Sequence, residues 1–172
     1  MTLFEIKHRY SNAVLFSLET ESLEFCVQAA VRRSVDLRGA ELGGMFFDGM
    51  YFFGANFEGV DLRGASFKRV CLGGADLRGA DLRGADFDGA DLRGAEGIFT
   101  MGTPNGWHAH AWLRDNWLSI RVGCREFRMA EARAHWAGKD DRREVMAALD
   151  YAEAVATIRG WALAAPTNQE AA

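Results

Sequence analysis

The sequence predicts a mainly β fold built on a short coil with four sides, and three observations at a period of five residues predict it. A large apolar residue stands at every fifth position, a smaller apolar residue or methionine stands two positions before it, and glycine stands two positions after it in every unit but one. A period of five fits neither the 3.6-residue repeat of a helix nor the two-residue repeat of a strand. The large apolar residues are Leu37, Leu42, Phe47, Phe52, Phe57, Leu62, Phe67, Leu72, Leu77, Leu82, Phe87 and Leu92.

A chain that turns a corner every five residues would point two side chains of each unit into a narrow shaft and three outward. Glycine supplies the unusual dihedral angles of a tight turn at little steric cost, and Arg69 occupies the one corner without it. At four sides per coil, residues 36–95 make about three coils at a strand spacing of about 4.8 Å. The predicted shaft is therefore only about 14 Å long.

The repeat unit resembles the pentapeptide-repeat family. Its pattern is clearest in Ala75-Asp76-Leu77-Arg78-Gly79 and in the next unit, residues 80–84, and it covers about a third of the chain. The resemblance implies a right-handed quadrilateral β-helix over residues 35–96. In several members it also implies DNA mimicry, in which an acidic rod occupies the DNA site of a nucleic-acid enzyme, whereas many other members have no assigned activity.

Residues 1–34 are predicted to form a hairpin and a helix that cap the first coil. Residues 3–9 and 13–18 have the apolar pattern of two strands around the turn-forming pair Ser11-Asn12. Residues 20–33 then place apolar side chains at helical spacing, with acidic residues at the start and arginines at the end. Such a cap would cover the open backbone edge of the first coil, which would otherwise favour aggregation.

Residues 97–165 are predicted to form a small α+β module. Strands are expected at 107–113 and 117–122, followed by a short helix at 129–136. A longer helix would begin at Asp141, with Glu144 in capping-box spacing, and run to about residue 163. Residues 166–172 are predicted to be a flexible polar tail.

Composition places the chain among compact proteins of a reducing compartment. It has 172 residues, 49% of them hydrophobic, which is enough to bury a core. Three cysteines at wide spacings do not suggest a disulfide framework, and no signal-like or membrane-spanning apolar stretch is seen. We therefore expect a cytoplasmic protein of the host cell. The net charge of −4 argues mildly against direct binding to nucleic acid.

The sequence offers no convincing catalytic or metal site, so we expect no enzyme activity, no metal and no cofactor. His108 and His110 have a spacing that zinc sites use, but no further ligand stands near them in the sequence. Cys124 and His135 lack an activating motif, and no phosphate-binding glycine loop is present.

Outward side chains 20 residues apart should stack in columns along the coil. One column is wholly acidic, and we take it as the predicted binding face: Glu41, Asp61 and Asp81, with Asp76, Asp86, Asp88 and Asp91 adjoining. Residues 36–95 contain ten acids and seven bases, so the shaft carries most of the negative charge. Since each base pair of DNA advances about 3.4 Å, the shaft could imitate about four base pairs. Alternatively, neighbouring acids and arginines only neutralise each other on a solvated surface.

Three aromatic side chains, Phe46, Tyr51 and Phe53, are predicted to point outward from the first coil. Exposed together they would form an apolar interface. Alternatively, the N-terminal hairpin or the C-terminal helices fold back over them.

The leading hypothesis from the sequence is a non-catalytic inhibitor or decoy that binds a bacterial nucleic-acid-binding complex. The arrangement resembles phage and prophage proteins, some of which are similar to anti-CRISPR proteins that present an acidic β-helix to a CRISPR surveillance complex. A second hypothesis is an assembly module, monomeric or homodimeric, that docks a partner through Trp107, Trp112 and Trp161. A third is inhibition of DNA gyrase, although the rods known for that activity are much longer.

Overall fold

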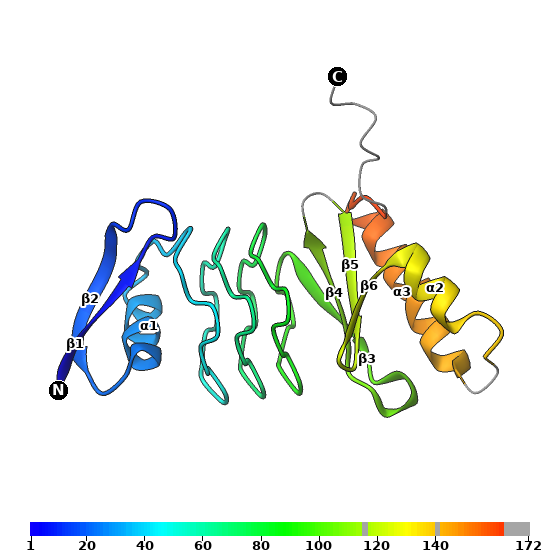
Figure 1. Cartoon of the computed structure of the whole chain (residues 1–172), viewed down its shortest axis with the longest axis horizontal. Coiled ribbons are helices and arrows are strands. Elements are labelled where there is room, and N and C mark those ends of the chain that lie inside the picture. The colour runs from blue at the N-terminus through cyan, green and yellow to red at the C-terminus, as the bar shows by residue number, and fades with distance from the viewer. Residues whose placement is uncertain (115–116, 140–141, 164–172) are drawn as a thin grey trace, which may run out of the picture. The chain divides into compact units, whose positions relative to one another are not determined.

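The computed structural model describes residues 1–114, 117–139 and 142–163 of the chain. The chain divides into two compact units, the first spanning Met1–Gly97 and the second beginning at Ile98. The first unit holds a hairpin, a helix and the five-residue repeats, and the second holds a sheet with two helices (Figure 1).

The first unit begins with an antiparallel hairpin of β1 (Thr2–Lys7) and β2 (Val14–Thr20). Asn12 adopts a positive φ of 56° in the turn, a conformation that asparagine tolerates better than most residues. The imidazole Nδ1 of His8 accepts the backbone N–H groups of Tyr10 and Ser11. The hairpin predicted around Ser11-Asn12 is therefore present, with strand ends shifted by one or two residues.

Helix α1 (Leu23–Arg32) packs against this hairpin. Ser22 caps the helix, because its hydroxyl accepts the backbone N–H of Phe25, and the helix therefore starts three residues later than the predicted 20–33. The buried residues of the helix are Cys26, Val27 and Ala30. The thiol of Cys26 donates a hydrogen bond to the carbonyl of Phe4.

Each corner of the repeat region is a tight turn. In the first one, the N–H of Ala40 donates to the carbonyl of Leu37 at 2.9 Å, and Gly39 has a φ of +70°. A bond between residues i and i+3 with positive φ at i+2 is the pattern of a type II turn, which favours glycine. Arg69 takes the same position with a φ of +57°, so its corner keeps the geometry without glycine.

Backbone pairing stacks the units that lie 20 residues apart. Parallel bridges join Glu41 to Asp61 and Asp61 to Asp81, and the other three sides of the coil pair in the same way. The N–H of Leu42 donates to the carbonyl of Asp61, and that of Leu62 to the carbonyl of Asp81, at 2.9 and 3.0 Å. The predicted columns of outward residues are therefore real.

The N-terminal segment pairs with the first coil. The N–H of Arg9 donates to the carbonyl of Gly39, and the N–H of Glu41 donates to the carbonyl of Lys7, both at 2.9 Å. These bonds satisfy backbone groups along one side of the coil edge, which would otherwise offer a template for another chain. At the other end of the repeats, Gly97 passes so close to Leu77 that a β-carbon would lie 2.6 Å from the Leu77 carbonyl carbon.

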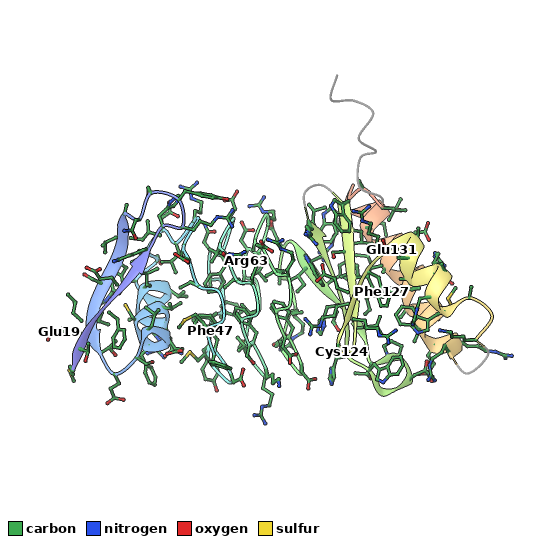
Figure 2. The ribbon with its side chains drawn as sticks, in the orientation of Figure 1. Glu19, Phe47, Arg63, Cys124, Phe127 and Glu131 are labelled. Carbon is green, nitrogen blue, oxygen red and sulfur yellow. The ribbon has the colours of Figure 1, made fainter. Side chains whose placement is uncertain are left out.

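The shaft is filled by the large apolar residue of every unit, each at most 7% exposed from Leu37 to Leu92. Three rings stack along one side: Phe47 and Phe67 have centroids 5.1 Å apart, and Phe67 and Phe87 lie 5.0 Å apart and nearly parallel. This distance matches the strand spacing, so the coil itself sets the aromatic stacking. Figure 2 labels Phe47 among the coil residues.

The second unit is a four-stranded antiparallel sheet in the order β3-β4-β5-β6, with two helices packed on one face. The strands are β3 (Ile98–Gly102), β4 (Ala109–Arg114), β5 (Trp117–Val122) and β6 (Arg125–Arg128), and a 3-10 turn, η1 (Pro104–Gly106), follows β3. The predicted central hairpin is present, although β4 begins two residues later than expected. The two outer strands were not predicted, because β3 bulges near Gly102 and β6 has only four mostly polar residues.

The helices of this unit are α2 (Met129–Trp136) and α3 (Arg143–Ile158). Their buried residues form a core with the inward side chains of the sheet, including Ala111, Ile120, Trp136 and Leu149. Helix α2 has the predicted bounds, whereas α3 ends five residues early. The expected cap at Asp141 and the predicted tail at 166–172 lie outside the described residues. Glu144 accepts the N–H of Asn105 at 2.6 Å.

Phe67→Ala is expected to destabilise the first unit by about 3–5 kcal/mol, because it opens a cavity between two stacked rings in a fully buried shaft. Chemical denaturation followed by circular dichroism measures the change. Phe46→Ala is the matched control, since Phe46 is 72% exposed and its loss should change the free energy of unfolding by less than about 0.5 kcal/mol. Equal effects for the two variants would contradict this account of the core.

Candidate functional site

The coil presents four faces, each with one outward column before and one after its central residues. We name each face by its first central residue: the Leu37 face, the Leu42 face, the Phe47 face and the Phe52 face. Each face repeats at intervals of 20 residues, so the Phe47 face, for example, also contains the units around Phe67 and Phe87. All residues of the predicted binding surfaces lie on these faces.

The Leu42 face carries the predicted acidic column, Glu41, Asp61 and Asp81, stacked as expected. Two arginines neutralise much of its charge. Arg63 donates from Nε and Nη2 to the two carboxylate oxygens of Asp61 at 2.8 and 2.5 Å, and Arg83 binds Asp81 in the same manner. Asp61 is only 3% exposed, so it offers little surface to a partner. Figure 2 labels Arg63 on this face.

The same two-residue clip recurs wherever the unit reads aspartate, leucine, arginine. Residues i and i+2 of an extended segment point to the same side, so the guanidinium reaches the carboxylate of its own unit. The remaining clips are Asp36–Arg38, Asp76–Arg78 and Asp91–Arg93. The arginine bonds lower the pKa of Asp36 and Asp91 from 3.8 to about 2. The alternative of mutual neutralisation therefore describes these acids.

The Phe47 face is the one face whose outward columns contain no arginine. It holds three acids, Asp48, Asp86 and Asp88, and one lysine, Lys68. Lys68 Nζ lies 3.4 Å from a carboxylate oxygen of Asp86, whose other oxygen accepts the N–H of Asp88 at 3.1 Å. Its outward residues sum to a net charge of −2, compared with −1 on the Leu42 face, and Arg69 stands at its adjoining corner. The Leu37 face also reaches −2 when Glu96, which pairs with Asp76, is counted. The absence of arginine at the outward positions of the Phe47 face could have identified this face from the sequence.

Asp48 is held in place on this face. Its Oδ1 atom accepts the hydroxyl of Ser66 and the backbone N–H of Lys68, both from the unit 20 residues further on. Both bonds use the same oxygen, so Oδ2 has no bond from any part of the chain that the structure describes, and the residue is exposed. The result is an exposed carboxylate with a defined position.

The three outward aromatics of the first coil are exposed: Phe46 by 72%, Tyr51 by 68% and Phe53 by 77%. The N-terminal hairpin, which belongs to the same unit, does not cover them. Coverage by the hairpin is therefore wrong, because the hairpin pairs with the Leu42 side of the coil through Lys7 and Arg9. Coverage by the C-terminal helices stays a prediction. An interface role for the three aromatics stays a prediction.

The tryptophans proposed for docking differ in their surroundings. Trp107 is 40% exposed, and the guanidinium of Arg142 lies 4.9 Å from its ring centre. Trp161 is half-buried and packs against Phe99 in the core of its own unit. Trp112 lies on the opposite side of β4 from the core residue Ala111. Only Trp107 of these three presents much surface.

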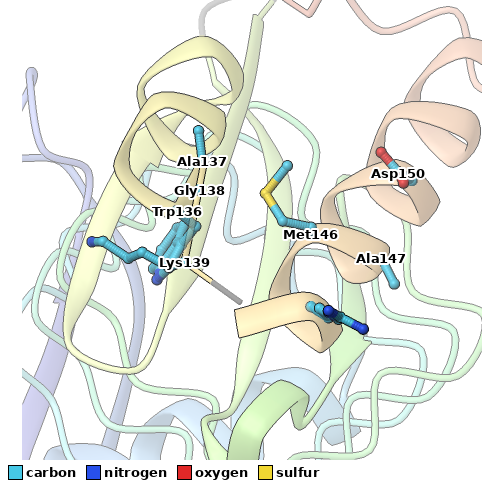
Figure 3. Close-up of a pocket in the computed structure, with 8 residues that line it drawn as sticks. Trp136, Ala137, Gly138, Lys139, Met146, Ala147 and Asp150 are labelled. Carbon is cyan, nitrogen blue, oxygen red and sulfur yellow. The ribbon is translucent and has the colours of Figure 1, made fainter. Parts of the chain in front are cut away.

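A shallow hollow lies between the end of α2 and the start of α3 (Figure 3). Trp136, Met146 and Asp150 contribute to its lining, and Asp150 is paired with Arg133 at 2.8 Å. Within residues 1–114, 117–139 and 142–163, no three His, Cys, Asp or Glu side chains are grouped so that they could hold a metal ion. Over the same residues, no helix has the length and hydropathy needed to span a membrane.

Comparison with known proteins identifies the repeat region. A family model described as pentapeptide repeats matches residues 33–69 and 65–96, with eight copies. A search of curated proteins gives no match.

Three solved structures illustrate the similarity. The pentapeptide repeat protein Rfr23 from the cyanobacterium Cyanothece 51142 is 27% identical, with a TM-score of 0.29, over 32% of this chain and 42% of its own. HetL from Nostoc sp. strain PCC 7120 is a pentapeptide repeat protein involved in heterocyst differentiation regulation. It is 32% identical, with a TM-score of 0.24, over 37% of this chain and 35% of its own. The pentapeptide repeat protein alr5209 from Nostoc PCC 7120 is 30% identical, with a TM-score of 0.19, over 45% of this chain and 74% of its own. This chain thus spans less than half of the length of the first two.

Acidification is expected to destabilise the coil between about pH 4 and pH 2. Asp36 and Asp91 have folded-state pKa values of about 2, below the ordinary 3.8, so the unfolded chain takes up these protons first. Their contribution to stability is complete above about pH 4 and is lost as the pH falls through 2. The double variant Arg38→Gln, Arg93→Gln should flatten this dependence in denaturation experiments.

The matched control for this pH dependence is Arg32→Gln, which removes an arginine of α1 outside the clips. It should leave the slope of stability against pH unchanged. A double variant with the same slope as the unaltered protein would show that the clips do not set these pKa values.

Proposed function

Because the chain belongs to the pentapeptide-repeat family through residues 33–96, we propose that it is a non-catalytic protein-binding module whose coil occupies the basic, nucleic-acid-binding surface of a bacterial protein complex. The observation that carries this proposal is the Phe47 face, with three acids, one lysine and no arginine on its outward columns. Basic surfaces that bind phosphates are attracted to such a face by the same electrostatic interaction.

The arginine clips change which face is best suited to this role. The Leu42 face, predicted from its acidic column, has Arg63 and Arg83 bonded to Asp61 and Asp81. An approaching basic surface would meet guanidinium groups there as well as carboxylates. The outward columns of the Phe47 face carry a net charge of −2, against −1 on the Leu42 face, so the attraction to a basic partner is stronger.

The scaffold supports binding because it is ordered by the coil bonds. Asp48 and Asp88 lie two coils apart in one column, hence about 10 Å apart at the strand spacing. Three base-pair steps of a DNA strand cover a similar distance of about 10 Å. The face can therefore occupy a local phosphate-binding patch, although it cannot replace a long duplex.

The finer hypothesis is that this surface imitates DNA and inhibits its target, as an anti-CRISPR protein of phage origin does to a CRISPR surveillance complex. The acidic face and the pentapeptide repeats support it. Gyrase is a weaker candidate target, because a shaft of about 14 Å covers only about four base pairs. An assembly role through the C-terminal unit has less support, since Trp161 is used by the core of that unit.

Neutralising the Phe47 face is expected to weaken partner binding by about tenfold, since each exposed ion pair contributes up to about 1 kcal/mol. The triple variant Asp48→Asn, Asp86→Asn, Asp88→Asn keeps the amide oxygens that can accept the bonds of Ser66, Lys68 and residue 88. The unaltered chain, immobilised in a nuclease-treated bacterial lysate, should retain nucleic-acid-binding proteins that a short DNA duplex then releases. The triple variant should retain much less.

A control of equal charge change places three substitutions on another face: Asp36→Asn, Glu58→Gln and Asp76→Asn on the Leu37 face. Circular dichroism first checks that both triple variants are folded. The control variant should then keep most of the partner binding. Equal losses in the two triple variants would argue for unspecific charge attraction. Retained proteins that excess duplex DNA does not release would reject occupation of a nucleic-acid site.

A further inference from the structure

We propose that Phe46, Tyr51 and Phe53, together with the carboxylate of Asp48, form an aromatic anchor for arginine side chains of the partner. This inference rests on the proposed function and names the chemical group that the coil selects. Phe46 and Asp48 lie two residues apart on the Phe47 face, and Tyr51 and Phe53 lie two residues apart on the Phe52 face. The four side chains thus follow one another around a single corner of the first coil.

The anchor is exposed on a rigid backbone. The three aromatic side chains are 68–77% exposed, which is unusual for large apolar groups gathered within eight residues. Their segments pair with the next coil, since Phe46 bridges Ser66 and Tyr51 bridges Cys71. Binding to them therefore requires little ordering of the backbone, which lowers the entropic cost of association.

Gly73 shows that the position of Phe53 is built into the neighbouring coil. A β-carbon at Gly73 would lie 3.1 and 3.2 Å from the Cδ2 and Cε2 atoms of the Phe53 ring. Gly73 is not a corner residue, because the corner glycine of that unit is Gly74, with a φ of +67°. The absence of a side chain at position 73 therefore makes room for the ring, which lies against the backbone there.

The charge beside the rings determines the kind of partner. Asp48 has an exposed carboxylate held by Ser66 and Lys68, and it lies two residues from Phe46 on the same face. A guanidinium can bind a carboxylate while its plane stacks on a ring. An ammonium group is more strongly hydrated and has no plane to stack, so lysine is a poorer fit. A second copy of this chain is also a poorer fit, because a symmetric contact would bring the two Asp48 carboxylates toward each other.

The test compares fluorescein-labelled hexa-arginine and hexa-lysine peptides by fluorescence anisotropy with the full chain. The unaltered protein should bind the arginine peptide about threefold to tenfold more tightly than the lysine peptide. The triple variant Phe46→Ser, Tyr51→Ser, Phe53→Ser should lose this preference while keeping its affinity for the lysine peptide. Asp48→Asn should weaken both peptides, and Gly73→Val, which displaces the Phe53 ring, should reduce the preference.

Tyr10→Ser is the control, since Tyr10 is 79% exposed and lies outside the anchor. It should leave the arginine preference intact. Equal affinity of the unaltered chain for both peptides, or an unchanged preference in the triple variant, would overturn the anchor while leaving charge-based binding in place. If neither peptide binds, the proposed attraction to basic surfaces fails as well. A dimer in light scattering that the triple variant dissociates would overturn the anchor in favour of self-association.

Discussion

The hydrogen-bonded corner is the constraint on which the rest of the first unit depends. A turn with positive φ at its third residue, repeated every five residues, forces the chain into four-sided coils. The stacking of residues 20 apart follows from that geometry, and so do the filled shaft and the straight columns outside. Arg69 shows that the turn geometry is retained even where the residue type does not favour it.

The surface charge of the coil depends on the spacing of residues within each unit. An arginine two residues after an aspartate lies on the same side of the extended segment, so the two side chains form an ion pair and neutralise each other. An acidic column is therefore not the same as an acidic surface. What a partner meets is the net charge that remains after such pairs, which is −2 on the outward columns of the Phe47 face and −1 on those of the Leu42 face.

The proposed function and the aromatic anchor describe one continuous surface around the corner between the Phe47 and Phe52 faces. Carboxylates of one face would attract a basic partner, and the exposed rings of the first coil would distinguish guanidinium from ammonium groups. Neither role needs catalytic chemistry or movement of the backbone. Both need a scaffold that holds short side chains at fixed positions, which the ladder of coil bonds supplies.

The sequence predicted the coil and its columns from the five-residue repeat, and the hairpin at Ser11-Asn12 and helix α2 from short runs of neighbouring residues. It did not predict β3 and β6, whose short or bulged segments become strands only through pairing with their neighbours. The exposure of Phe46, Tyr51 and Phe53 and the seating of Phe53 over Gly73 were also decided by tertiary structure. The physical reason is that strand pairing and packing between coils join residues that are not neighbours in the sequence, such as Phe53 and Gly73, so local preference does not determine them.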